Sequence, residues 1–283
     1  MILRIPGFDS IIEAALAEDL SLGDPTTAAL IPAHLTGRAS FVSRQPGVLA
    51  GIEVALAVMR KVDPDLKLKA LLLDGDVVEP GAALGTVEGR VSSILMGERT
   101  ALNFLQRMSG IATITAKFME AVEGTAATIV DTRKTAPGLR SLDKYAVAAG
   151  GGRNHRMCLG DGILIKDNHI AALRAEGISL AQVVRRAKTR APHTVKVEVE
   201  IETLVEAQEA IKGGADILLA DNMGPDELAK VVELARGRVM VEASGGINLE
   251  SVAAIAKTGV NLISVGALTH SVKALDIGLD YDA

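Results

Sequence analysis

A group of basic residues in the middle of the chain has the composition of a site for a small anion. Residues 133–166 contain seven Lys or Arg side chains and two Asp side chains, whereas the whole chain carries a net charge of −5. Local positive charge in an acidic protein favours a small anionic ligand over a polyanion. The main candidates are Arg133, Lys134 and Lys166. Guanidinium groups suit this role because they bind carboxylates and phosphates in bidentate fashion.

Three acidic residues farther along the chain could complete such a site. The carboxylates of Glu198, Glu200 and Asp221 suit Mg²⁺ or ribose hydroxyl groups, and Mg²⁺ beside a phosphorylated substrate keeps most of its waters. Glu198 and Glu200 share one face of a predicted strand, so either could be the main carboxylate. We expect no His or Cys metal site, because the chain has one Cys and its His residues lack a close helical pairing.

Two glycine-containing segments late in the chain predict a phosphate site. Ser244, Gly245 and Gly246 precede a helix predicted to begin near Asn248, and backbone N–H groups in such a turn can bind a phosphate. Gly266 follows the next predicted strand. In (β/α) barrels, the loops after the last strands are the usual phosphate site.

These candidate residues lie at or near the carboxyl ends of predicted strands. Beyond residue 127, strands alternate with helices of about ten residues, which indicates βαβ units and a parallel sheet. Six strands are clear, and there is room for a short seventh near Gly152. The predicted strands are residues 127–132, 163–166, 195–201, 216–220, 238–242 and 261–265, and the predicted helices are residues 141–149, 180–190, 204–212, 225–235 and 249–257.

The strand of residues 196–202 favours a barrel over an open sheet. Its charged residues share one face, and its Val and Ile residues share the other. Helices cover both faces of an open α/β sheet, so three buried carboxylates on one face would be very costly. In a barrel, the outer face packs against helices while the upper interior can open into an active site.

The first part of the chain has the pattern of a smaller α+β domain. We expect its first helix to begin at a capping box formed by Ser10 and Glu13. A long helical pattern from Val91 to about Val122, with a break at Ser109-Gly110, is the expected connection to the barrel. The other predicted elements are strands over residues 37–44, 67–73 and 83–88 and a helix over residues 51–62.

The composition argues against several classes of protein. The chain has 283 residues, enough for about two domains at roughly 150 residues each, and 48% of them are hydrophobic, which argues against global disorder. Net negative charge and 2% aromatic residues argue against a nucleic-acid-binding protein. The longest run without a charged residue, 258–272, is too short to span a bilayer. The single Cys and the lack of an apolar leader fit a cytoplasmic protein.

From the residues alone, we expect a barrel enzyme that binds a carboxylated anion next to a phosphorylated sugar, with Mg²⁺. Chemistry at a sugar carbon would pass through an oxocarbenium-like state that nearby carboxylates stabilise. The pattern leaves a ribosyl transfer, a sugar-phosphate isomerase and an aldolase open. A non-catalytic ligand-binding barrel is a further alternative, although it would have no use for both the carboxylates and the cations.

Nine motifs in order resemble those of the quinolinate phosphoribosyltransferase family, and the resemblance covers nearly the whole chain. The motifs are EDLSLGD (18–24), GERTALN (97–103), DTRKT (131–135), GGGRNHR (150–156), IKDNH (165–169), VEVE (197–200), DN (221–222), SGG (244–246) and SVGA (264–267). The resemblance implies the reaction of quinolinate with phosphoribosyl pyrophosphate in NAD synthesis. The products of that reaction are nicotinate mononucleotide, pyrophosphate and CO₂, and no organic cofactor is required.

The resemblance also implies the architecture. We expect an α/β protein with an incomplete (β/α) barrel of six or seven parallel strands and an N-terminal α+β open-sandwich domain. The implied domains are residues 1–106 for the sandwich and 107–267 for the barrel, and the tail of residues 268–283 joins the sandwich. Members of the family form homodimers, with higher oligomers open, and the active site lies at the dimer interface.

The motifs carry residue roles with them. Arg133, His155, Arg156 and Lys166 would hold the quinolinate carboxylates, and Arg99 would reach in from the partner subunit. Lys134, Glu200 and Asp221 would be catalytic, with Glu200 and Asp221 also near the Mg²⁺ of phosphoribosyl pyrophosphate. Contacts to the phosphoribosyl group are implied for Thr132, Lys134, Glu200, Asp221, Ser244, Gly245, Gly246, Val265, Gly266 and Ala267.

Two positions depart from the family pattern. Cys158 stands where the family usually has Gly, which could tighten the turn that carries His155 and Arg156, and Pro25 stands where a β-branched residue is usual. An alternative is a molybdenum-transport-associated relative of the same fold. That relative tends to lack the segment beginning at Lys166, which is intact here, so the quinolinate enzyme is favoured.

Overall fold

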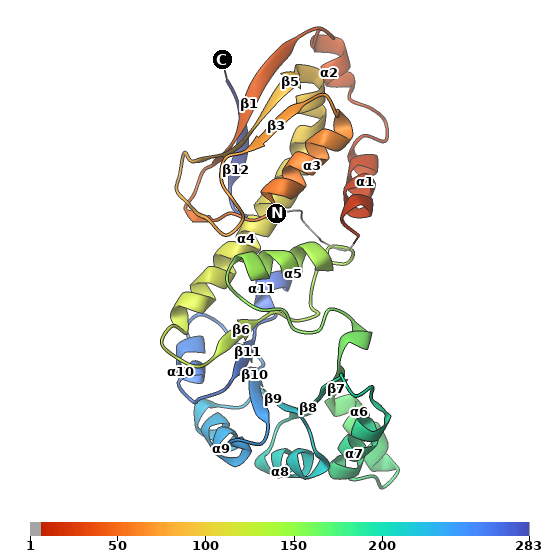
Figure 1. Cartoon of the computed structure of the whole chain (residues 1–283), viewed down its shortest axis with the longest axis vertical. Coiled ribbons are helices and arrows are strands. Elements are labelled where there is room, and N and C mark those ends of the chain that lie inside the picture. The colour runs from red at the N-terminus through yellow and green to blue at the C-terminus, as the bar shows by residue number, and fades with distance from the viewer. Residues whose placement is uncertain (1–6, 283) are drawn as a thin grey trace. The chain divides into compact units, whose positions relative to one another are not determined.

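The computed structural model describes residues 7–282 and divides into two compact units (Figure 1). The first unit contains residues 7–116, Thr135–Gly151 and residues 268–282. The second contains Lys117–Lys134 and Gly152–Ala267. None of the helices in residues 7–282 is both long enough and apolar enough to cross a membrane.

An antiparallel four-stranded sheet is the centre of the first unit, with the order β12-β1-β5-β3. Helix α3 (Ile52–Val62) contacts β3 and β5, and its apolar residues form one buried face. The strands are β1 (Thr36–Ser43), β3 (Lys67–Ala70), β5 (Ala83–Arg90) and β12 (Ile277–Tyr281). The remaining elements of this unit are α1 (Phe8–Asp19), α2 (Pro25–Leu30), β2 (Gly47–Val48), β4 (Val77–Val78), α5 (Arg140–Ala149) and most of α4 (Val91–Ala121) and α11 (Ala267–His270).

The predicted capping box at the first helix is wrong. Helix α1 begins two residues before Ser10, and its N-cap is Gly7, whose φ of 74° lies in the left-handed region that favours glycine. The Ser10 hydroxyl donates a hydrogen bond to the Gly7 carbonyl oxygen at 2.8 Å instead of capping the helix. Pro25 is the first residue of α2, where its missing N–H costs no helical hydrogen bond.

The predicted break at Ser109-Gly110 is also wrong, because α4 is one continuous helix of 31 residues. Glycine serves close packing here: a Cβ on Gly110 would lie 2.3 Å from the backbone oxygen of Lys273. The buried Ser109 hydroxyl accepts a hydrogen bond from the Ala50 N–H and donates one to the Ala50 carbonyl oxygen. Both residues therefore connect α4 to other segments of the first unit, a function that local sequence does not reveal.

Six parallel strands form the sheet of the second unit, in the order β6-β11-β10-β9-β8-β7. Val130 at the end of β6 also forms a parallel bridge with Arg153, at the place of the predicted seventh strand. Within residues 7–282, no pairing joins that segment to β7, so the ring of strands is open there. This confirms the incomplete barrel. The strands are β6 (Thr128–Val130), β7 (Ile163–Ile165), β8 (Val197–Ile201), β9 (Ile217–Asp221), β10 (Met240–Ser244) and β11 (Leu262–Ser264).

Strand β8 has the two faces that the sequence predicts, and all five of its residues are buried. Helices α7 and α8 contact this strand, and helices lie along the outside of the sheet (Figure 1). Among the helices of the second unit, α6 was not predicted. The N–H of Lys166, which precedes this helix, donates to Nδ1 of His169 at 3.0 Å and so caps its first turn. The helices are α6 (Asp167–Ala175), α7 (Leu180–Arg190), α8 (Leu204–Gly213), α9 (Pro225–Ala235) and α10 (Val252–Ala256).

Candidate active site

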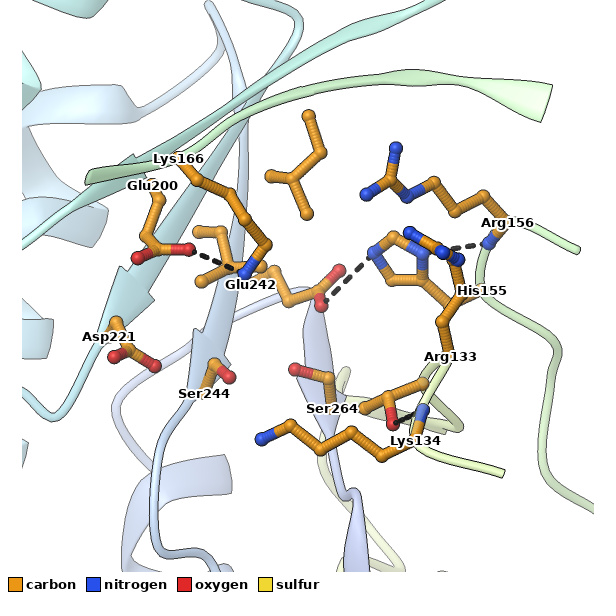
Figure 2. Close-up of a pocket in the computed structure, with 13 residues that line it drawn as sticks. Arg133, Lys134, His155, Arg156, Lys166, Glu200, Asp221, Glu242, Ser244 and Ser264 are labelled. Carbon is orange, nitrogen blue, oxygen red and sulfur yellow. Dashed lines mark hydrogen bonds and ion pairs between the residues drawn. The ribbon is translucent and has the colours of Figure 1, made fainter. Parts of the chain in front are cut away.

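A cavity of about 380 Å³ lies at the carboxyl ends of the barrel strands (Figure 2). Nine of the residues proposed from the sequence line it, although they come from six separate segments of the chain. Parallel strands place their carboxyl ends at one edge, so residues distant in sequence meet there. The lining residues are Thr132, Arg133, Lys134, His155, Arg156, Leu164, Lys166, Glu200, Leu219, Asp221, Glu242, Ser244 and Ser264.

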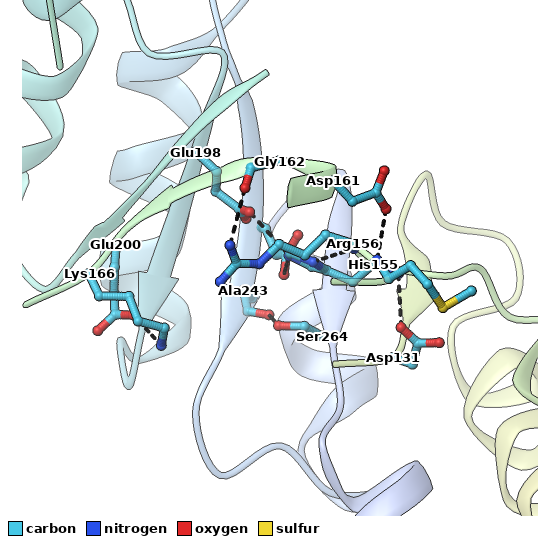
Figure 3. A network of polar contacts seen from close by, with 12 residues as sticks. Asp131, His155, Arg156, Asp161, Gly162, Lys166, Glu198, Glu200, Ala243 and Ser264 are labelled. Carbon is cyan, nitrogen blue, oxygen red and sulfur yellow. Dashed lines mark hydrogen bonds and ion pairs between the residues drawn. The ribbon is translucent and has the colours of Figure 1, made fainter. Parts of the chain in front are cut away.

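Two guanidinium groups share this cavity. The buried Nε of Arg133 has no hydrogen-bond partner among residues 7–282. Burial, followed by the positive charge of Arg133, lowers the pKa of Arg156 from its ordinary value. Nη1 of Arg156 donates to the Gly162 carbonyl oxygen at 3.1 Å, which fixes the direction of its side chain (Figure 3). An anion between the two groups would relieve their repulsion and give Arg133 an acceptor.

Lys166 and Glu200 form an ion pair inside the cavity, with 3.1 Å between Nζ and Oε2. Lys166 follows the last residue of β7, and Glu200 is on the neighbouring strand β8. The Lys166 side chain is half exposed, whereas that of Glu200 is nearly buried. The ammonium group can therefore exchange this carboxylate for that of a ligand at small cost, because an ion pair with one solvated partner contributes little.

His155 is held on both sides of its ring by protein atoms. Its Nδ1 accepts a hydrogen bond from the Arg156 N–H at 2.7 Å, so the ring proton is on Nε2. Nε2 lies 3.1 Å from Oε2 of Glu198 and 3.6 Å from Oε1 of Glu242. The imidazole therefore links the segment that carries Arg156 to the interior of the barrel.

Asp131 holds the segment of His155 and Arg156 in place through hydrogen bonds. It directly follows β6 and is fully buried. Its Oδ1 accepts the His155 N–H at 2.9 Å (Figure 3). Its Oδ2 accepts from Nδ2 of Asn154 at 2.7 Å. Asp131 thus sets the backbone position of His155 and Arg156 without lining the cavity itself.

The turn after β10 requires glycine at one position. Gly245 has a φ of 92°, and a Cβ there would lie 2.2 Å from the side chain of Asn222. The predicted helix start near Asn248 is wrong, because α10 begins at Val252 and has five residues. The Asn248 side chain instead accepts the N–H groups of Glu250 and Ser251, which gives a turn. A phosphate site here would rest on the glycine turn rather than on a helix N-terminus.

Cys158 does not tighten the turn after Arg156. Its thiol is exposed and free, and its φ of −144° is an extended conformation that any residue adopts. The local turn is held elsewhere, by the Met157 N–H donating to Oδ2 of Asp161 at 2.7 Å. The expected effect of this departure from the family pattern is therefore not found.

Two family models together match nearly the whole chain. The model described as the quinolinate phosphoribosyl transferase N-terminal domain matches residues 24–109, and the model of the C-terminal domain matches residues 111–280. The chain belongs to the quinolinate phosphoribosyltransferase family.

Relatives in this family match at similar levels. The decarboxylating quinolinate phosphoribosyltransferase 1b of Nicotiana tabacum is 44% identical, over 98% of this chain and 83% of its own. The chloroplastic carboxylating nicotinate-nucleotide pyrophosphorylase of Arabidopsis thaliana is also 44% identical, over 98% of this chain and 84% of its own. The solved nicotinate-nucleotide pyrophosphorylase of Francisella tularensis has a TM-score of 0.91 at 38% identity and covers 99% of this chain, with 98% of its own chain matched.

Some residues that the family resemblance marks do not line the cavity. Arg99 is exposed on α4, in the first unit. Gly245 and Gly246 follow β10, and residues 265–267 follow β11, where the Val265 N–H donates to the Val130 carbonyl oxygen at 3.0 Å. These segments border the strands that form the cavity without being among its lining residues.

Three residues of the site had no role assigned from the sequence, and a fourth has a different one. Glu242 and Ser264 line the cavity and Asp131 holds its wall. Glu198, a candidate for Mg²⁺ or ribose hydroxyls, instead contacts His155. Their signal was present, because each lies in or just after a barrel strand. The sequence could not show which of these acids contacts which partner, because those contacts depend on the order of the strands and on the pleat of each strand.

Proposed function

We propose that the chain transfers the phosphoribosyl group of phosphoribosyl pyrophosphate to quinolinate and removes one carboxylate as CO₂. The products are nicotinate mononucleotide, pyrophosphate and CO₂. The observation that carries this proposal is the meeting of four cations and three acidic side chains in one barrel cavity. The names of the decarboxylating and carboxylating relatives support the reaction class, a pentosyl transfer in NAD biosynthesis.

The cations bind the acid. Quinolinate is a dianion that must lose its water, and Arg133, Arg156 and Lys166 replace that water with fixed positive charge. The unpartnered Nε of Arg133 offers a ready donor. The family motif places His155 in this group as well; because protein atoms engage both its ring nitrogens, we assign it the task of orienting Arg156.

The order of events follows from the chemistry of the ring. The pyridine nitrogen attacks the anomeric carbon of the ribose, and pyrophosphate leaves. The ring nitrogen then carries positive charge, which stabilises the carbanion left when the adjacent carboxylate departs as CO₂. Lys134 and Thr132, at the end of β6, are placed for the phosphoribosyl group, together with Ser244 and the glycine turn that follows it.

Mg²⁺ fits the acidic side of the cavity. Glu200 and Asp221 lie on neighbouring strands β8 and β9 and line the same cavity, and they offer the oxygen ligands that this ion prefers. Glu198 is less suitable, because its Oε2 is taken by His155 and it does not line this cavity. When bound, the ion neutralises the pyrophosphate as it leaves. Glu200 and Asp221 would hold it directly or through water.

A dimer would complete the site. Arg99 is a cation of a family motif, it is exposed, and it belongs to the unit without the cavity. We assign it to the quinolinate site of a second copy of the chain in a cytoplasmic homodimer. The alternative is a surface ion pair with a neighbour such as Glu98, which would contribute about 0–1 kcal/mol.

A product assay tests the function. The purified chain is incubated with quinolinate, phosphoribosyl pyrophosphate and Mg²⁺, and pyrophosphate, CO₂ and nicotinate mononucleotide are measured, with nicotinate as the comparison acid. Equal amounts of the three products are expected from quinolinate. Arg133→Ala should abolish turnover, whereas the matched control Arg174→Ala, in an exposed ion pair with Glu206, should leave it unchanged. A wild-type chain without these products would refute the proposal.

A further inference from the structure

Glu242 occupies an unusual position for an acid. It is the third residue of β10, it is 1% exposed, and its carboxyl group lies in the centre of the cavity between His155 and Lys166 (Figure 2). Its Oε1 has no hydrogen-bond partner among residues 7–282. An ionised carboxylate here, beside the cations proposed for quinolinate, would repel the carboxylates of that substrate, so a neutral acid suits this position better.

The surroundings of Glu242 favour that neutral form. Glu198 lies beside it, and ligand atoms of His155, Glu198 and Glu242 all lie within 4.8 Å of one another. Two carboxylates this close cannot both ionise easily without a counter-charge. Burial, and after it the negative charge of Glu198, raises the pKa of Glu242 to about 8. At neutral pH the group therefore holds a proton.

A proton is a better occupant of this cluster than a metal ion. Three such groups could hold a divalent cation by distance alone. However, Arg156 directly follows His155 and lines both cavities that this cluster borders, so a divalent cation bound at the cluster would add its charge to that of this guanidinium group. A single proton shared by Glu198 and Glu242 relieves the repulsion between the two acids and brings in one positive charge instead of two.

The proposed reaction needs a proton at one defined step. When the C2 carboxylate leaves as CO₂, the electron pair of the broken C–C bond stays on C2 of the pyridine ring. Nicotinate mononucleotide carries hydrogen at that carbon, so a proton must be delivered there before CO₂ recombines. A positioned acid in contact with the ring is the usual solution to such a requirement.

We propose that Glu242 donates this proton, and that its proton is restored from solvent through a second cavity on the other side of the cluster. In the step, the C2–carboxylate bond breaks, CO₂ leaves, and both electrons of the broken bond stay on C2. The O–H bond of Glu242 then breaks, and its proton forms the C2–H bond. Glu242 becomes an anion and regains a proton from water. The inference deepens the proposed function and rests on it.

The second cavity supplies the route to water. It measures about 460 Å³ and is lined by the first residues of β7, β9, β10 and β11, so it lies at the amino ends of the strands. It shares His155, Arg156 and Glu242 with the first cavity and adds Glu198. Its lining includes Thr194 and Lys196, which are exposed. The cluster is therefore the wall between a substrate cavity and a cavity that reaches solvent.

The test measures phosphoribosyl transfer and decarboxylation separately in one variant. Glu242→Gln replaces a neutral acid by a neutral amide of the same shape. Pyrophosphate release in a single turnover should stay close to the wild-type rate. CO₂ release should fall on the order of 100-fold, within the range for loss of a general acid. An intermediate heavier than nicotinate mononucleotide by the mass of CO₂ should accumulate and be seen by mass spectrometry.

Two further measurements keep the outcome clear. The affinity for quinolinate should be unchanged in Glu242→Gln; a tighter complex would mean that Glu242 is ionised and would overturn the inference. Glu242→Asp keeps the acid and should recover part of the CO₂ release, which a purely structural role would not predict. Glu233→Gln, an exposed acid on α9, is the matched control and should leave both rates unchanged.

The failures of the two proposals are distinguishable. If wild-type protein releases no pyrophosphate with quinolinate, the proposed function fails. If wild-type protein turns over and the folded Glu242→Gln or Glu242→Asp variants lose pyrophosphate and CO₂ release equally, or lose neither, Glu242 is not the proton donor. Thermal unfolding of each variant establishes that the comparison is between folded proteins.

Discussion

The ammonium group of Lys166 lies 3.1 Å from the carboxylate of Glu200, at the ends of the paired strands β7 and β8. The cation proposed for quinolinate is thus paired with the carboxylate proposed for phosphoribosyl pyrophosphate. On these proposed roles, binding of either substrate would change the partner of a residue that serves the other. We therefore expect the two halves of the site to be coupled through this ion pair.

Glu200→Gln should uncouple the two substrates. Lys166 would lose its partner and become free for quinolinate, so the affinity for quinolinate should rise by up to about fivefold, since such half-exposed pairs contribute about 0–1 kcal/mol. Use of phosphoribosyl pyrophosphate should fall sharply. Calorimetric titration of each ligand measures both effects. Glu206→Gln, which removes the partner of Arg174, is the control, and weaker binding of quinolinate to Glu200→Gln would contradict the coupling.

The cavity should distinguish quinolinate from nicotinate. Nicotinate has one carboxylate fewer, so it leaves at least one of Arg133, Arg156 and Lys166 without a partner in the bound state. These side chains are only partly buried, so leaving one of them unpaired should cost about 2 kcal/mol, the lower end of the range for a buried charge. Competition between the two acids for the same enzyme measures this difference in kcat/KM. Comparable kcat/KM values for the two acids would show that the cations do not recognise the second carboxylate of quinolinate.

Asp221 should affect one substrate far more than the other. It is the last residue of β9 and faces the cavity beside Ser244. Asp221→Asn removes a charge suited to Mg²⁺, so Mg²⁺-dependent binding of phosphoribosyl pyrophosphate should weaken while quinolinate binding changes little. Separate titrations of the two ligands decide the matter. A loss confined to quinolinate would mean that the assigned roles are reversed.

Arg99 should act across a dimer interface. Arg99→Ala and Lys166→Ala should each be nearly inactive alone. In a mixed dimer, one of the two sites keeps both groups, so mixing the two inactive proteins and allowing subunit exchange should restore activity. Mass spectrometry of differently tagged chains shows whether exchange has occurred. Exchange without recovered activity would remove Arg99 from the neighbouring site.

Glu242 should leave a signature in the pH dependence of stability. Its pKa is raised to about 8 in the folded chain from an ordinary value of 4.5, so between these values the folded state holds a proton that the unfolded state releases. The free energy of unfolding therefore falls as the pH rises from about 4.5 to 8. Glu242→Gln lacks this contribution, so its Tm relative to wild type should be higher at pH 8 than at pH 5. Parallel Tm profiles would place the pKa of Glu242 near its ordinary value.

Sequence was sufficient for the parts of the fold that depend on local pattern. The alternation in residues 196–202 predicted a strand with an apolar outer face and an acidic inner face, and β8 has both. The same reasoning failed at Gly110, because the segment of Lys273 that approaches it is more than 150 residues away in the chain. It also failed at Asn248, where a side-chain turn replaces the first turn of a helix.

The candidate active site shows the same difference between features that follow from local sequence and features that depend on distant segments. The candidate residues could be named from their places near the ends of predicted strands and from the family motifs, and nine of them line one cavity. The partners of those residues could not be named, because the contact of His155 with Glu198 joins segments whose proximity depends on the whole barrel. Glu242 is the clearest case: its residue type is visible in the sequence, whereas the lack of a hydrogen-bond partner for its Oε1 among residues 7–282 appears only in three dimensions.

The pairing of β12 with β1 has a consequence for how the chain folds as it is synthesised. Ala39 pairs with Tyr281, so the inner position of β1 in its sheet depends on residues made about 240 positions later. Until Ile277–Tyr281 leave the ribosome, β1 is an edge strand with unpaired backbone groups, open to pairing with other chains. Every barrel strand is synthesised in that interval, so the barrel can form before the first sheet is complete.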